Sequence, residues 1–168
     1  MPQLVVPRLS VAASVRAAAR EHGDDPQPVY SDIVAWLADA ELPAYVEGLL
    51  ASTREWVPRP DGHVPSTHLW WVQDTTFVGR VHIRHRLTPF LREVGGHLGY
   101  HVVPTHRRRG HATAMLATAL PIAAALGLDC LLLTCDADNV ASRKVLEANG
   151  GLLQDRRGNK LRFWVPTV

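Results

Sequence analysis

Hydrophobic positions in the first third of the chain recur at helical spacing. A short apolar segment, residues 4–9, predicts a strand, and the alanine- and arginine-rich run 11–21 predicts a helix. A second helix is predicted after Ser31, and a third from about residue 43 to residue 55. The chain therefore opens with one strand and a helical layer.

From residue 68 onward the period changes to that of strands. Apolar residues alternate with polar ones or form short buried runs, which turns and two helical segments separate. The predicted strands are 69–73, 77–86, 97–103, 129–135 and a closing hairpin of 152–153 with 161–165, and the predicted helices are 110–126 and 139–149.

The order of these elements predicts an α/β (α+β) fold. Strands joined by short loops pair antiparallel, whereas the helix at 110–126 crosses between strands 97–103 and 129–135 and makes that pair parallel. We expect a mixed, mostly antiparallel sheet with helices on both faces. The parallel pair should splay there into a ligand crevice.

The turn before the helix at 110–126 has the composition of an anion site. A strand ends at Pro104, three arginines follow at 107–109, and the small residues Gly110 and Ala112 stand where the helix begins. Amide groups at a helix N-terminus, together with the helix dipole, bind phosphate. This turn is predicted to bind a polyphosphate-bearing small molecule.

Composition limits the class of protein. The length of 168 residues and the hydrophobic fraction of 46% fit a single domain over residues 1–168. No apolar run approaches the roughly 20 residues that span a bilayer, and no signal-peptide pattern opens the chain. We therefore expect a cytoplasmic protein with no membrane partner.

Cysteine and charge content exclude further classes. Cys130 and Cys135 lie in one predicted strand on opposite faces, so no disulfide between them is expected. Neither has the Cys or His neighbours of a zinc site, and no metal is expected. The formal charge of +2 argues against a nucleic-acid partner, although the arginine triplet leaves a nucleic-acid-binding module as a rival hypothesis.

The chain resembles the GCN5-related N-acetyltransferase (GNAT) family. The family's pyrophosphate signature is Gln or Arg, two residues, Gly, one residue, and Gly or Ala, which the segment 107–112 matches as RRRGHA. The segment 136–142, DADNVAS, follows the next strand as in the family. The segments 84–87, 95–100 and 147–151 are similar to a bacterial subgroup of predicted acetyltransferases.

This resemblance implies acetyl-CoA as the acetyl donor. In the family the turn holds the pyrophosphate, the end of the preceding strand pairs with the pantetheine arm, and an asparagine and a nearby serine lie close to the thioester sulfur. The corresponding residues here are Arg107, Arg108, Arg109, Gly110, His111, Ala112 and Thr113 for the turn, Val102 and Val103 for the strand, and Asn139 and Ser142.

One position departs from the family pattern. Many members carry a tyrosine seven residues after the asparagine, and this tyrosine protonates the leaving thiolate. The corresponding residue here is Leu146, which has no proton to donate. Water, another residue or unaided departure of the thiolate must replace it, since a free thiol has a pKa of about 8.5.

Acetyl transfer also needs a group that removes a proton from the acceptor ammonium. Strand alternation places His97 and His101 on one face, and likewise His82 and Arg84. We expect a polar cleft there, with His97 as the base and His82, Arg84 and His101 binding the acceptor. Alternatively, His97 bonds the loop at 95–96, and Arg84 pairs with Glu93 or an aspartate.

The sequence thus predicts an acetyl-CoA-dependent N-acetyltransferase. Its acceptor is a primary amine of a small molecule or peptide, attacked directly in a ternary complex. The alternative, which Leu146 supports, is a non-catalytic CoA-binding sensor or partner-binding protein. The acceptor's identity, and whether the chain is a monomer or a homodimer, stay open.

Overall fold

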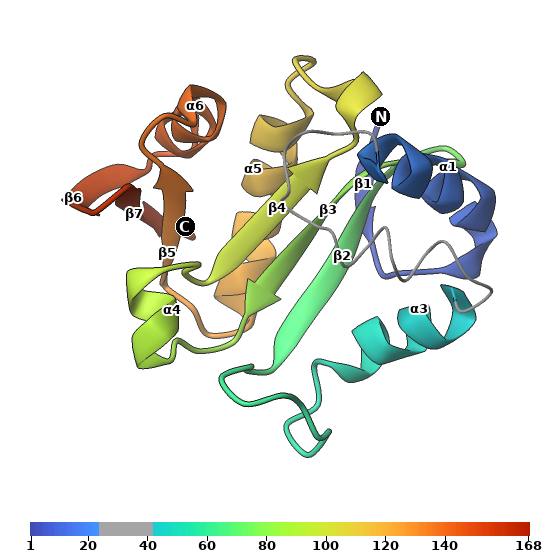
Figure 1. Ribbon diagram of the computed structural model, residues 1–168, viewed down its shortest axis with the longest axis horizontal. Helices are drawn as coiled ribbons and strands as arrows, with labels where there is room; N and C mark the ends of the chain where they lie inside the picture. Colours follow the sequence, from blue (N-terminus) through green and yellow to red (C-terminus); the bar gives the residue numbers. More distant parts are fainter. Residues whose placement is uncertain (24–41) are drawn as a thin grey trace.

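A computed structural model describes residues 1–23 and 42–168 (Figure 1). Strand β1 (Gln3–Val5) is shorter than predicted, because Leu9 already starts a 3₁₀ turn that leads into helix α1 (Ala12–Gly23). Helix α3 (Leu42–Ala51) corresponds to the predicted third helix and ends earlier. The helix predicted after Ser31 falls outside the described residues.

The first sheet, sheet A, is antiparallel with the order β1-β2-β3-β4. Its long strands are β2 (Ser66–Gln73), β3 (Thr76–Arg84) and β4 (Leu98–Val102). The register pairs His68 with His82 and Arg80 with His101. These pairs place the polar residues of three strands on one face, as their alternation in the sequence predicts.

A short helix, α4 (Pro89–Glu93), lies in the connection that the sequence analysis treated as a loop. Thr88 caps it by accepting a hydrogen bond from the Leu91 amide at 3.2 Å, and Pro89 occupies the first turn. A threonine N-cap followed by proline is a helix-start signal. Its five residues are too few to show a hydrophobic period.

The second half of the chain follows the predicted order. Helix α5 (His111–Ala125) precedes β5 (Cys130–Asp136), and helix α6 (Val140–Ala148) precedes the hairpin β6 (Leu152–Arg157) and β7 (Lys160–Pro166). The last three strands form a second antiparallel sheet, sheet B, with the order β5-β7-β6.

The predicted parallel pair, β4 and β5, does not form a continuous ladder. The two strands meet at their starts, where the His97 amide donates to the Leu132 carbonyl at 2.7 Å. They then diverge toward their C-terminal ends, as Figure 1 shows. The splayed pair is the boundary between sheets A and B.

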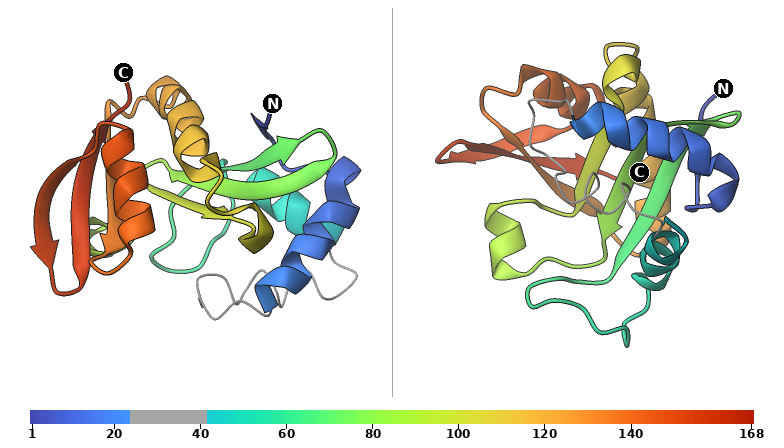
Figure 2. Two further views of the ribbon diagram at one scale, coloured as in Figure 1. Left: turned by 90° about the horizontal axis from the view of Figure 1, so that it is seen from above. Right: turned by 45° about the vertical axis from the view of Figure 1, so that its right-hand side comes forward.

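Helices cover both faces of sheet A (Figure 2). Helix α5 packs on one face in a core that includes Trp71, Ile83, Met115 and Leu133 and continues onto sheet B. Helices α1 and α3 pack on the opposite face, around Trp70. Sheet A is thus held between two hydrophobic clusters. Its edge strand β4 faces the splay from β5, which we call the opening.

Candidate active site

At the splay between β4 and β5, β4 is the last strand of sheet A and has a strand partner on one side only among the described residues. The Val103 amide donates to the Val78 carbonyl of β3 at 2.9 Å. Because backbone groups alternate in an antiparallel pair, those of Tyr100 and Val102 face the opening. Val103 turns its amide to β3 and its side chain into the α1 and α3 cluster. The backbone groups of Val102 thus face the opening, whereas the Val103 amide is already engaged by β3.

The arginine turn has the backbone of an anion site. Arg108 and Gly110 both adopt left-handed conformations, with φ of 62° and 79°. The first intrahelical bond of α5 runs from the Ala114 amide to the Gly110 carbonyl at 3.0 Å. The amides of His111, Ala112 and Thr113 therefore belong to the first turn, whose N–H groups have no acceptor within the helix. Left-handed residues before such amides form a concave cradle for anions.

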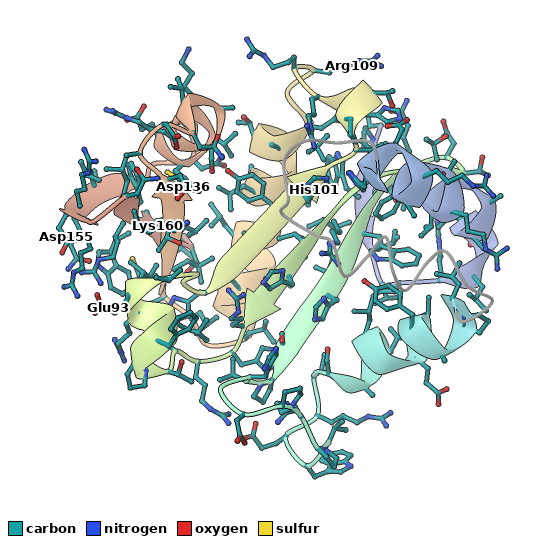
Figure 3. The ribbon with its side chains drawn as sticks, viewed as in Figure 1. Glu93, His101, Arg109, Asp136, Asp155 and Lys160 are labelled. Carbon is teal, nitrogen blue, oxygen red and sulfur yellow. The ribbon has the colours of Figure 1, made fainter. Side chains whose placement is uncertain are left out.

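Side chains of the turn have different roles. Arg107 Nε donates to the Val102 carbonyl at 3.1 Å and so braces the end of β4. His111 Nδ1 accepts from Trp71 Nε1 at 3.3 Å, which ties the first turn of α5 to β2. Burial, then His106 and Arg109, lowers the pKa of His111. Arg108 and Arg109 are exposed, and Figure 3 shows Arg109 at the outer rim.

The opposite rim of the opening is the start of α6. Asn139 caps this helix, since its Oδ1 accepts from the Ser142 amide at 3.0 Å. The Ser142 hydroxyl lies 2.7 Å from the hydroxyl of Tyr100, which reaches across from β4. The sequence analysis did not select Tyr100. The sequence signal that could have identified Tyr100 is its position two residues before Val102, because residues two apart in a strand lie on the same side of it.

Leu146 is a core residue in this structure. Its side chain is 1% exposed and packs in the cluster shared by α5 and sheet B. A proton donor at the opening must therefore come from elsewhere, and Tyr100 and Ser142 are the hydroxyl groups that meet there.

The polar face predicted on sheet A is present. The rings of His68 and His82 stack at 5.6 Å, and the His82 ring stands directly over Gly99, whose missing Cβ leaves room for it. Burial, with Arg80 and Arg84 nearby, lowers the pKa of His68 to about 4. Burial, with Arg84 and His68 nearby, holds the pKa of His82 well below 6.5. Both rings are neutral near pH 7.

Arg84 supports the loop before β4. Its Nη1 donates to the carbonyls of Gly95 and Gly96 at 3.1 and 2.9 Å. Glu93, the partner suggested by the sequence, pairs with Arg157 instead. The guanidinium of Arg84 therefore contacts the hinge between sheets A and B.

His97 lies at the closed end of the opening. Its Nδ1 accepts from the Leu132 amide at 2.9 Å while its own amide donates to the Leu132 carbonyl. Burial, then Arg92 and Arg84, lowers the pKa of His97 to about 4. An imidazole with this pKa and an engaged Nδ1 is a poor base near neutral pH. The geometry favours a structural role for His97, through Leu132 rather than the loop at 95–96.

His101 faces a cavity between sheet A and the helices α1 and α3. Its Nε2 lies 2.9 Å from Nε2 of His22, in the last turn of α1. Arg80, its partner on β3, donates to the Tyr45 hydroxyl at 3.0 Å. These four side chains supply the polar lining of a cavity that is otherwise apolar. The sequence predicted His101 as an acceptor-binding residue, whereas His22 and Arg80 were not predicted site residues, because these contacts join segments that are distant in sequence.

Three further observations concern the cysteines, groups of metal-ligating side chains and the length of the helices. Cys130 and Cys135 are both free thiols, one exposed and one buried. Within residues 1–23 and 42–168, no group of three or more His, Cys, Asp or Glu side chains could hold a metal ion. No helix in the part of the chain that the structure describes has the length and apolarity to cross a membrane.

Residues 25–151 match the family described as the acetyltransferase (GNAT) domain. The chain belongs to the GNAT family. The resemblance seen in the sequence is confirmed by this match, which covers more than half of the 168 residues. The chain is thus an acetyl-CoA-dependent acetyltransferase. A comparison with curated protein sequences found no match.

Solved structures show the same GNAT fold. RimJ of Mycobacterium smegmatis, in complex with a CoA disulfide, is 24% identical with a TM-score of 0.66, over 99% of this chain and 86% of that one. PaiA N-acetyltransferase of Thermoplasma acidophilum, in complex with CoA, is 13% identical with a TM-score of 0.63, over 99% of both chains. YncA of Salmonella typhimurium, with acetyl-CoA, is 11% identical with a TM-score of 0.62, over 100% of this chain and 94% of that one.

Proposed function

We propose that this single-domain GNAT chain transfers the acetyl group of acetyl-CoA to a primary amine of a small molecule or peptide, by direct attack in a ternary complex. The observation that carries the proposal is the opening at the splay of β4 and β5. An anion cradle at the start of α5 lies at one rim, and paired hydroxyl groups from β4 and α6 span the opening. Solved structures of similar fold contain CoA or acetyl-CoA.

The residues present fit this cofactor. The amides of the turn from Arg107 to Thr113 would hold its pyrophosphate, and the outward backbone groups of Val102 would pair with its pantetheine arm. The Val102 carbonyl already accepts from Arg107, so its amide is the better placed group. The Oδ1 of Asn139 is used in its cap, so a contact with the cofactor falls to its amide nitrogen.

Acetyl-CoA supplies the acetyl group as an activated thioester. The chain's own contribution begins with position, because holding amine and thioester together replaces a bimolecular encounter. The hydroxyl pair of Tyr100 and Ser142 then supplies a proton where thiolate leaves, in place of the tyrosine that Leu146 replaces. Ser142 belongs to the first turn of α6, whereas Tyr100 belongs to β4.

The acceptor amine would enter from the polar face of sheet A, on which His82, Arg84 and His101 lie. His82 and His101 line this face directly, whereas Arg84 acts on the loop at 95–96 and so shapes the site. A peptide amine is one acceptor to test, since RimL, a protein of similar structure, is a ribosomal L7/L12 alpha-N-protein acetyltransferase. His97 has no catalytic role in this proposal.

The test is release of CoA thiol when the purified chain is mixed with acetyl-CoA and a panel of amines, amino acids, polyamines and peptides. Mass spectrometry should find one product heavier by one acetyl group. Omitting the amine is the control for simple hydrolysis. Binding of acetyl-CoA without thiol release across the panel would instead favour a CoA-binding sensor.

A further inference from the structure

Asp136, the last residue of β5, has no role in the site described so far. The neighbouring Cys135 packs in the hydrophobic cluster that α5 forms with both sheets. Because side chains alternate along a strand, Asp136 lies on the opposite face of sheet B. On β4, Val102 belongs to the same cluster, so the neighbouring His101 also lies on the face away from α5. Asp136 and His101 therefore lie on the same face of the two sheets.

The two residues also lie at the same level along their strands. His97, directly before β4, and Leu132 of β5 are joined where the strands meet, since the His97 amide donates to the Leu132 carbonyl at 2.7 Å. His101 and Asp136 each follow four residues later, and four residues of strand extend about 13 Å. Both residues therefore lie toward the splayed ends of β4 and β5. Figure 3 labels them on either side of the opening.

The carboxylate of Asp136 binds an ammonium group of the chain itself. Lys160 Nζ lies 2.7 Å from Asp136 Oδ1, and the side-chain nitrogen of Asn159 lies 3.4 Å from the same oxygen. Within residues 1–23 and 42–168, Oδ2 of Asp136 makes no hydrogen bond or ion pair. The Asp136 side chain is 44% exposed. This carboxylate therefore already pairs with one primary ammonium and has a second oxygen for another.

The ion pair of Asp136 and Lys160 is easier to rearrange than its neighbour on sheet B. Arg162, whose side chain is 5% exposed, binds Asp155 through two nitrogens at 2.6 and 2.8 Å. Such a fork fixes the geometry of a pair, whereas lysine is a point charge on a flexible stem. An ion pair as exposed as that of Asp136 and Lys160 also adds little to stability. Asp136 can therefore bind another cation without disturbing sheet B.

We propose that Asp136 binds a second, non-reacting cationic group of the acceptor, so that diamines, or peptides with a basic side chain next to the reacting amine, are the preferred acceptors. This inference rests on the proposed function, because it needs an amine acceptor at the opening. The reacting nitrogen must be neutral when it attacks, and a carboxylate beside it would keep it protonated. The contact is therefore with a second cation, for which Lys160 competes.

The test compares acceptors that differ only in the second charge. Diaminobutane is paired with pentylamine, in which a methyl group replaces one ammonium. A peptide with lysine after its N-terminal residue is paired with the same peptide carrying methionine there. Thiol release by the unsubstituted chain should give a kcat/KM about 10-fold higher for the charged member of at least one pair. Preference in neither pair would overturn the proposal.

Two substitutions at the ion pair should act in opposite directions. Asp136→Asn should lower kcat/KM for the charged acceptor about 10-fold, through a higher KM, because the carboxylate is lost. Lys160→Met should raise the same kcat/KM, because the competing ammonium is gone. A purely structural ion pair would make both variants change in the same direction or not at all. Asp61→Asn, in an exposed turn, is the matched control and should leave kcat/KM unchanged.

The two proposals fail in different ways. A chain that releases no CoA with any amine overturns the proposed function, and this inference with it. An active chain whose Asp136→Asn variant keeps its preference for the charged acceptor overturns only the role of Asp136. If Asp136→Asn does not fold, as judged by circular dichroism, Lys160→Met decides, because an unchanged or lower kcat/KM for the charged acceptor contradicts competition at Asp136.

Discussion

The hydroxyl oxygens of Tyr100 and Ser142 lie 2.7 Å apart, one from β4 and one from α6. They join two elements on opposite sides of the opening between sheets A and B. A hydroxyl in such a contact can donate its own proton while it accepts another, so the pair can pass a proton outward. In the proposed function this contact would supply the proton that Leu146, buried in the core, cannot donate.

Removing the serine hydroxyl should slow the step in which the thiolate leaves. We expect Ser142→Ala to lower kcat roughly 100-fold, at the low end for acid catalysis because a thiolate is a fair leaving group. Tyr100→Phe keeps the ring and should cost less, roughly 10-fold, if it orients the serine. Steady-state assays of thiol release measure kcat for both variants. Equal kcat values for the unsubstituted chain and the two variants would contradict a role of the hydroxyl pair in proton donation.

Gly110 can be tested against a glycine at the other end of the same helix. Gly110 and Gly127 have φ of 79° and 82°, and a Cβ would meet nothing within 4 Å at either. Alanine at each should cost about 1 kcal/mol of unfolding free energy, because the left-handed conformation is strained for a side chain. Only Gly110→Ala should also weaken CoA binding by calorimetry, since only that turn forms the anion cradle. Equal binding by both variants would contradict the cradle.

Much of this architecture follows from local pattern. The turn at 107–112 was identified because a strand, small residues and a helix start occupy consecutive positions, and each has its own sequence signal. The helix that starts at residue 139 and the hairpin from β6 to β7 were predicted for the same reason. Short helix α4 was missed because five residues carry a cap but no period.

The acceptor side was harder to predict because its contacts join distant segments. His22 and His101 are 79 positions apart, and Tyr100 and Ser142 are 42 apart, so neither pair has a spacing that a motif could encode. The different surroundings of His97 and His101 have the same origin. Alternation puts both on strand 97–103, and only the splay of β4 from β5 determines which of them is buried at the hinge.

The hinge itself depends on Gly96. A Cβ at this position would lie 2.2 Å from the Leu132 carbonyl oxygen, and its φ is 61°. Gly96→Ala should therefore cost about 3 kcal/mol of unfolding free energy, from backbone strain and from a clash that only backbone movement can relieve. Gly62→Ala, with φ of 79° and open space, isolates the strain alone and should cost about 1 kcal/mol. Urea unfolding measures both, and equal losses would contradict the clash.

The protonation of His97 gives the last prediction. Its pKa is lowered from 6.5 to about 4 in the folded chain, chiefly by burial. Between pH 6.5 and about 4 the unfolded chain binds more protons than the folded one. The contribution of His97 to the unfolding free energy is therefore fully present above pH 6.5, and it is lost as the pH falls toward 4. For one group the slope is at most about 1.4 kcal/mol per pH unit. His68, whose pKa is also lowered to about 4, adds to the same loss.

Two substitutions separate the hinge role from catalysis. His97→Asn offers a side-chain oxygen to the Leu132 amide and cannot titrate, so it should fold and show a shallower loss of unfolding free energy below pH 6.5. His97→Leu removes the acceptor and should be less stable at every pH, because a buried amide is left without a partner. Thiol release by His97→Asn should keep the unsubstituted pH profile. If its acidic limb disappeared instead, His97 would be the base, and its structural role alone would not account for the histidine.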